Sequence, residues 1–142
     1  MTTARQTEKD NVARPRRSPA WIAGTVLTVV LAVFLAFDSI TKIVDTKMSR
    51  DGTVALGFSA DKTMVIGWVL LVCLVVFLIP RTAVLGALGL TAYLGGAVTA
   101  NLRADKPLFA FVLSGAYVGI LLWISLTLRR PELLRVLGIR RD

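Results

Sequence analysis

Histidine is absent from this chain of 142 residues, and cysteine occurs once, at Cys73. Without histidine, the common ligand of haem, zinc and copper sites is missing. A single cysteine can form neither a disulfide within the chain nor a dithiol pair for exchange. We therefore predict no metal site, no catalytic residue and no cofactor of the chain's own.

The motifs of the common enzyme classes are also missing. The sequence has no phosphate-binding glycine loop, no GxGxxG opening a strand, no HExxH and no constellation of nucleophile and base. Its glycine pair lies inside an apolar stretch, where it cannot serve as a phosphate cradle. A protein that is not an enzyme on its own is favoured.

Charged residues are scarce, at 18% of the chain against 55% hydrophobic residues, and the mean hydropathy is +0.69. A water-soluble domain of this length needs more polar surface to cover its core. The net charge is +8, but the basic residues gather at the two ends and are not interleaved with aromatic residues. We therefore expect contact with an anionic lipid bilayer and no nucleic-acid partner.

Four apolar stretches are each about as long as the roughly 20 helical residues that cross a hydrocarbon core about 30 Å thick. Only Pro80 and Arg81 separate the second stretch from the third. One helix across both would extend about 57 Å, so we expect a hairpin there, with Pro80 at the first position of the third helix. The predicted fold is an all-α membrane protein with four transmembrane helices in an antiparallel bundle, at about 21–42, 63–79, 82–100 and 108–128 within a domain of residues 21–130.

Charge predicts the orientation of this bundle. Eleven of the 17 Lys and Arg residues lie in the two tails and the Pro80–Arg81 turn, and six lie in the opposite loops. By the positive-inside rule, both ends face the cytoplasm. We expect a basic, disordered tail over 1–20, a second basic tail over 131–142, and a multi-pass protein of the cytoplasmic membrane. A cleaved signal peptide is the alternative for the first stretch, but that stretch is too long and no clear A-x-A site follows it.

The third stretch is dense in small residues. Ala92, Gly96 and Ala100 are four residues apart, and Gly95 adjoins them. Small residues at this spacing let helices approach closely in lipid, so we predict that this stretch packs the bundle. The alternative is that Gly95 and Gly96 make room for a flat ligand such as a quinone.

Polar residues fall at the outer ends of the first and third stretches. Asp38 and Lys42 are four apart and share a helix face, and Asn101 and Arg103 lie at a comparable depth. Ionisable groups at membrane depth tend to face the bundle interior and to be functional. We predict that these four residues form an outer polar pocket. The alternative is an interfacial ion pair whose long side chains hold the helix ends at the headgroups.

The second half of the chain resembles the DoxX-like family of small four-helix bacterial membrane proteins. The resemblance rests on FLIPRTAVLGALGLTAYLGGAVTANLR after GWVLLVC, with further likeness in FDSITKI and Leu56-Gly57-Phe58, and it covers about 34–130. Two positions depart from the family. Asn101 stands where many relatives have histidine, and Asp38-Ser39 stands where Ser-Gly is common, which argues against proton or metal chemistry that depends on that histidine.

The resemblance implies a four-helix bundle in the bacterial cytoplasmic membrane. The function we expect is that of a non-catalytic subunit or scaffold that recruits membrane or redox subunits, in a redox or oxidative-stress-related complex. One alternative is a quinone- or lipid-binding subunit of a membrane oxidoreductase, of the thiosulfate:quinone oxidoreductase type. Another is a small oligomeric transporter or channel, and a homo-oligomer is compatible with each of these functions.

Overall fold

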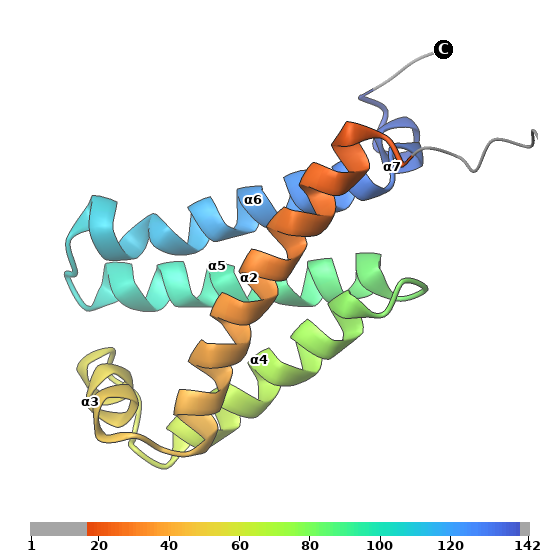
Figure 1. Cartoon of the computed structure of the whole chain (residues 1–142). Coiled ribbons are helices and arrows are strands. Elements are labelled where there is room, and N and C mark those ends of the chain that lie inside the picture. Colours follow the sequence, from red (N-terminus) through yellow and green to blue (C-terminus); the bar gives the residue numbers. More distant parts are fainter. Residues whose placement is uncertain (1–16, 140–142) are drawn as a thin grey trace, which may run out of the picture.

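The computed structural model describes residues 17–139, which form helices and contain no β-strand in that range. The long helices are α2 (Pro19–Ile43), α4 (Lys62–Leu78), α5 (Ala83–Arg103) and α6 (Ser114–Arg129), and a π-helical turn, η1 (Leu108–Val112), precedes α6. Two short helices, α3 (Lys47–Ala55) and α7 (Glu132–Val136), lie at the ends of the molecule (Figure 1). The all-α fold class is confirmed. Most of the expected N-terminal tail (1–16) and the last residues of the C-terminal tail (140–142) lie outside the described residues.

Within residues 17–139, three segments are long and apolar enough to cross a membrane, namely α2, α5 and η1 together with α6. The fourth apolar helix, α4, has 17 residues. At 1.5 Å per residue it is about 26 Å long, slightly less than the usual hydrocarbon thickness. With η1 and α6 taken together, the bounds of these segments differ from the predicted spans by at most three residues.

The long helices form a ring in which each contacts two neighbours. Helix α2 contacts α4 and α6, and α5 contacts the same two helices from the other side. In Figure 1, α2 crosses obliquely in front of α5. The interior is filled mainly by leucine, with the buried core consisting of Leu31, Leu35, Leu70, Leu74, Phe77, Ala83, Ala87, Leu90, Leu122 and Leu126.

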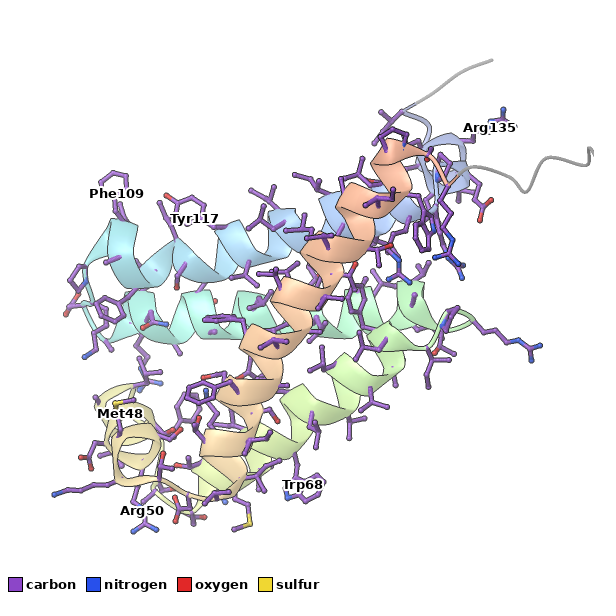
Figure 2. The ribbon with its side chains drawn as sticks, in the orientation of Figure 1. Met48, Arg50, Trp68, Phe109, Tyr117 and Arg135 are labelled. Carbon is purple, nitrogen blue, oxygen red and sulfur yellow. The ribbon has the colours of Figure 1, made fainter. Side chains whose placement is uncertain are left out.

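The outward faces of the long helices are apolar as well. Trp68, Phe109 and Tyr117 point away from the bundle in Figure 2, and each is about half exposed or more. Many aliphatic side chains of α2 and α4 are equally exposed. Such a surface in water would be far larger than the apolar patches of soluble proteins. These exposed apolar faces are therefore suited to the hydrocarbon of a lipid bilayer.

A glycine lies at each of the four contacts in the ring. Gly24 faces α6, Gly67 faces α2, Gly86 faces α4 and Gly115 faces α5, and a Cβ at any of them would come within 2.9 Å of an atom of the facing helix. The closest approach is at Gly86, where a Cβ would overlap the backbone of Phe77. These four positions let the helices meet backbone to backbone.

The small residues predicted to pack the bundle do not make these approaches. Ala92, Gly95 and Gly96 are exposed and Ala100 is half-buried. A Cβ added at Gly95 or Gly96 would meet no atom of the described chain within 4 Å. The four-residue spacing identified a small-residue face of α5, but the face that meets α4 carries Gly86 instead. Packing at Gly95 and Gly96 would require contacts outside the described chain.

The hairpin between α4 and α5 also differs from the prediction. Pro80 lies in the turn, and α5 begins three residues later, at Ala83. The Thr82 hydroxyl donates a hydrogen bond to the carbonyl of Val76 (2.9 Å), so the turn is closed by a side chain. The proline therefore ends the preceding helix and does not start the next one.

We predict that Gly86→Ala destabilises the folded bundle by about 1–3 kcal/mol, because the new methyl group must displace the α4 backbone. Gly96→Ala is the matched control in the same helix. It adds a methyl group in open space and should be neutral or stabilising by up to about 1 kcal/mol. Thermal unfolding of the detergent-solubilised protein measures both, and equal stability of the two variants would contradict the assigned contact.

Candidate functional site

A cavity of about 430 Å³ lies at the end of the bundle that carries α3. We call it the α3-end cavity. Its walls come from the last turns of α2 and α5, from α3, from the segment that follows α5 and from η1. The lining residues are Phe37, Asp38, Thr41, Lys42, Thr46, Met48, Ser49, Gly52, Thr53, Leu56, Asn101, Lys106 and Phe111.

The α2 wall of this cavity is held in place by a buried hydrogen bond. Ser39 is fully buried and donates from its hydroxyl to the Gly67 carbonyl of α4 (2.9 Å). The missing side chain of Gly67 also lets the Cβ of Lys42 come close to the α4 backbone. The turn of α2 that carries the candidate residues is therefore fixed against α4.

Two of the predicted site residues form an ion pair on α2. The Lys42 ammonium lies 2.5 Å from a carboxylate oxygen of Asp38, and the two side chains are 18% and 39% exposed. This is the favourable i, i+4 order. An ammonium group has three donors, and the bond to Asp38 uses one of them. Lys42 thus retains hydrogen-bonding capacity at the cavity wall.

The other two predicted residues are separated by the structure. The Asn101 amide donates to the Ala97 carbonyl (2.8 Å), and Asn101 lines the cavity. Arg103 is exposed and is not among the lining residues. Residues two apart on a helix lie about 200° apart around its axis, so Asn101 and Arg103 cannot share a face. The structure thus brings Asp38, Lys42 and Asn101 together and leaves Arg103 out.

Lys106 takes the place at the cavity that the sequence suggested for Arg103. Asp105 has a positive φ of 51°, and the Lys106 amide donates back to the Asn101 carbonyl (3.1 Å). This tight turn after α5 returns the chain toward the cavity. The sequence did not reveal Lys106, because the turn geometry decides where its side chain goes.

Helix α3 covers the cavity, and its start is fixed by the preceding turn. Asp45 has a positive φ of 57°, and both the amide and the hydroxyl of Thr46 donate to the Thr41 carbonyl (3.1 Å each). An ion pair between Arg50 and Asp45 ties α3 to the same turn. Figure 2 shows Met48 on the short helix at this end of the molecule.

The cavity offers donors and apolar walls but few reactive groups. Lys42, Lys106 and Asn101 can donate hydrogen bonds, Asp38 is the single carboxylate, and Phe37 is one of two aromatic walls. Among the described residues, no three His, Cys, Asp or Glu side chains are close enough together to hold a metal ion. The arrangement is suited to holding a small carbonyl-bearing or anionic group.

Comparison with known proteins identifies a family. The model of the DoxX-like family matches residues 26–125, which is more than half of the chain. The matched segment contains the α2 and α5 walls of the cavity and η1. Comparisons with curated proteins and with solved structures find no match.

We predict that Ser39→Ala destabilises the bundle by about 1 kcal/mol, because the buried Gly67 carbonyl loses its side-chain donor. Thr99→Ala is the control, since the Thr99 hydroxyl is exposed and bonds within its own helix; it should cost less. Denaturation of both variants in the same detergent makes the comparison. A Ser39→Ala protein as stable as Thr99→Ala would show that this bond does not fix the α2 wall.

Proposed function

The chain belongs to the DoxX-like family and is an integral, multi-pass membrane protein, and from this premise we propose that it is a non-catalytic subunit of a membrane complex. In this role it crosses the cytoplasmic membrane four times as an antiparallel bundle, with both ends in the cytoplasm. It recruits partner proteins of a redox or oxidative-stress-related complex. The α3-end cavity, on the outer side, is the contact site.

Four spans are supported by α4, although it is the shortest of the long helices. Its 17 residues run from Lys62 to Leu78 and contain no acidic or basic side chain after the first. About 26 Å of helix can cross the hydrocarbon if the bilayer thins slightly. With α4 in the ring between α2 and α5, a hairpin that left the membrane early would expose apolar side chains to water.

The orientation is supported by the charge at the two ends of the described bundle. The end with α7 carries five arginines and one acidic residue, Glu132. The end with α3 carries six basic and five acidic residues. Lys and Arg are enriched on the cytoplasmic side of short membrane proteins. The α7 end is therefore the cytoplasmic end in this proposal.

The non-catalytic role rests mainly on the chemistry of the α3-end cavity. Its polar groups are ammonium, amide, hydroxyl and carboxylate, and the sequence has no histidine. Its lid, α3, is a short helix with Met48 81% exposed. A methionine exposed beside a polar hollow is an adaptable contact for another protein. This combination of groups favours binding of a partner protein over catalysis.

A second candidate function is supported by the two aromatic walls. Phe37 and Phe111 line the same cavity as the donors of Lys42 and Asn101. Aromatic faces with hydrogen-bond donors at their edge suit a quinone ring, whose carbonyls accept hydrogen bonds. The chain would then bind a quinone for a partner that supplies the redox centre.

Topology is tested by single cysteines in a Cys73→Ser background. A membrane-impermeant maleimide should label Asp51→Cys on intact cells. It should label Arg81→Cys and Val136→Cys only after permeabilisation, because these two positions lie on the cytoplasmic side. Labelling of Arg81→Cys and Val136→Cys from opposite faces would contradict the four-span arrangement.

Recruitment is tested by co-purification from crosslinked native membranes in mild detergent. Lys42→Ala and Asn101→Ala should reduce recovery of the partner about tenfold, as expected for the loss of a charged or buried hydrogen bond. Arg103→Ala is the control, since Arg103 lies outside the cavity, and should have no effect.

Recovery of the chain alone under all these conditions would contradict recruitment. The same purified variants, titrated with a water-soluble quinone analogue, decide between the two functions. Binding that weakens on Lys42→Ala but not on Arg103→Ala would favour the quinone site over the scaffold.

A further inference from the structure

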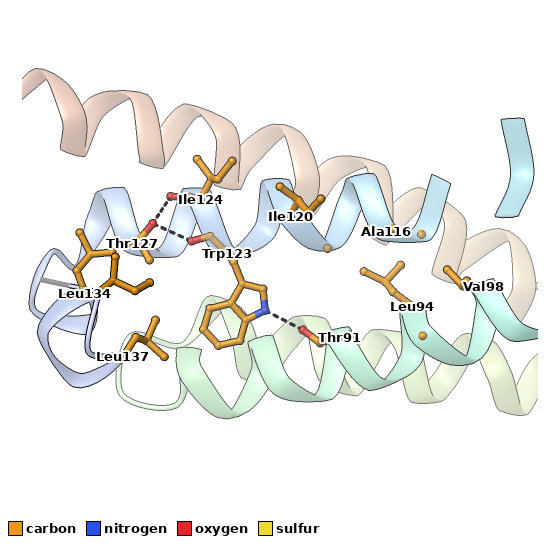
Figure 3. A pocket seen from close by; sticks show the side chains of 14 residues that line it. Thr91, Leu94, Val98, Ala116, Ile120, Trp123, Ile124, Thr127, Leu134 and Leu137 are labelled. Carbon is orange, nitrogen blue, oxygen red and sulfur yellow. Dashed lines mark hydrogen bonds between the residues drawn. The ribbon is translucent and has the colours of Figure 1, made fainter. Parts of the chain in front are cut away.

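A second, mainly apolar hollow of about 680 Å³ runs between α5 and α6 toward α7. We call it the α5–α6 groove, and Figure 3 shows it from close by. Leu94, Gly95 and Val98 line it on α5, and Gly119 and Ile120 line it on α6. Because the glycines carry no side chain, the floor of the groove lies close to the helix backbones.

One hydrogen bond joins α5 and α6 beside the groove. The indole nitrogen of Trp123 donates a hydrogen bond to the hydroxyl of Thr91 (3.0 Å) across the two helices. Thr127, one turn further along α6, turns its hydroxyl onto its own helix. The polar atoms along the groove are thus already bonded, and the surface left is hydrocarbon. Leu134 and Leu137 border the groove at the α7 end (Figure 3).

A third hollow, of about 620 Å³, adjoins the groove at the α7 end. We call it the α2 N-terminal cavity. Thr127 and Leu134 line both hollows, so the two adjoin each other. The lining of the α2 N-terminal cavity is basic, because it includes Arg17 and Arg129 and no carboxylate.

The α2 N-terminal cavity is suited to a phosphate group. Ser18 caps the start of α2, and the first turn of that helix has no acidic residue to offset the positive end of its dipole. The Arg17 guanidinium lies 4.4 Å from the centroid of the Trp21 ring, which orients it beside the helix end. One nitrogen of Arg129 is 3.4 Å from the Thr28 hydroxyl, and the remaining donors of its guanidinium can take further acceptors.

We propose that these two hollows together bind one anionic phospholipid of the surrounding bilayer. The headgroup phosphate lies between Arg17 and Arg129 at the start of α2, and one acyl chain lies in the α5–α6 groove. From Thr127 to Gly115 the groove follows about 18 Å of helix, close to the roughly 15 Å of one hydrocarbon leaflet. A phospholipid supplies both parts, namely a phosphate group and an acyl chain about as long as one leaflet.

Charge favours a lipid over a second copy of the chain as the occupant. Copies in one membrane share their orientation, so a second copy would bring its own five arginines to the same depth. Like charges at close range are repulsive in a low dielectric. An anionic lipid instead neutralises them, and basic pockets at helix ends are known binding places for acidic headgroups.

The test is native mass spectrometry of the delipidated full-length protein, titrated with phosphatidylglycerol or with phosphatidylcholine of the same acyl chains. We expect phosphatidylglycerol to bind about tenfold more tightly, given two arginines at the headgroup. In the double variant Arg17→Gln, Arg129→Gln this preference should fall to within about twofold. Equal affinity of the wild-type protein for both lipids would overturn the proposal.

The groove is tested separately by a pair of neighbouring glycines. Gly95 lines the groove and Gly96 does not, and a Cβ added at either would meet no atom of the described chain within 4 Å. Gly95→Leu should therefore weaken lipid binding about tenfold while Gly96→Leu leaves it unchanged, since only the former fills the place of the acyl chain. These two glycine variants still test the proposal if the arginine variant does not fold.

Two further outcomes would also overturn the proposal. Inorganic phosphate that binds as tightly as the lipid would show that the groove takes no part. A dimer that is present in the delipidated wild-type protein and is lost in Gly95→Leu would show that another copy of the chain fills the groove. Lipid binding that weakens both in the arginine double variant and in Gly95→Leu supports the proposal.

Discussion

Close approach of helix backbones at four glycines is the constraint on which the rest of this structure depends. In lipid, apolar side chains gain nothing by leaving the solvent, so helices associate through close packing and polar bonds. Each contact in the ring has one position where a side chain would collide with the facing helix, and at Gly86 the collision would be with the backbone of Phe77. Shape complementarity therefore fixes the crossing points, and the crossing points fix where the helix ends diverge.

Both candidate binding regions lie away from the buried leucine core. None of the core residues lines the hollows, which lie toward the ends of the bundle or on its outer face. The α3-end cavity is polar and balanced in charge, with a short helix as its lid. The α2 N-terminal cavity is basic and adjoins an apolar groove. One bundle thus presents two different chemical environments at opposite ends.

The sequence predicted what depends on composition along the chain, and it missed what depends on contacts between distant segments. Apolar length predicted the long helices, and the charge pattern predicted that Asp38 and Lys42 pair on one helix face. The spacing of small residues suggested Gly95 and Gly96 as packing positions, but spacing alone does not say which helix face meets a neighbour. Likewise, Arg103 was grouped with Asn101 by depth, although helical periodicity turns it away, and the turn at Asp105 brings Lys106 instead.

The pairing of α2 with α6 has a consequence for biosynthesis. Gly24 lies against Leu128, and Thr28 bonds to Arg129, so the first and last long helices close the ring. Those partners are about 100 residues apart, so the ribosome makes the α6 partner long after α2. Until then α2 has one of its two neighbours, and its face with Gly24 and Thr28 must be held by the insertion machinery or by lipid. The slowest step of assembly should accordingly be this late closure, and not the formation of the early hairpin.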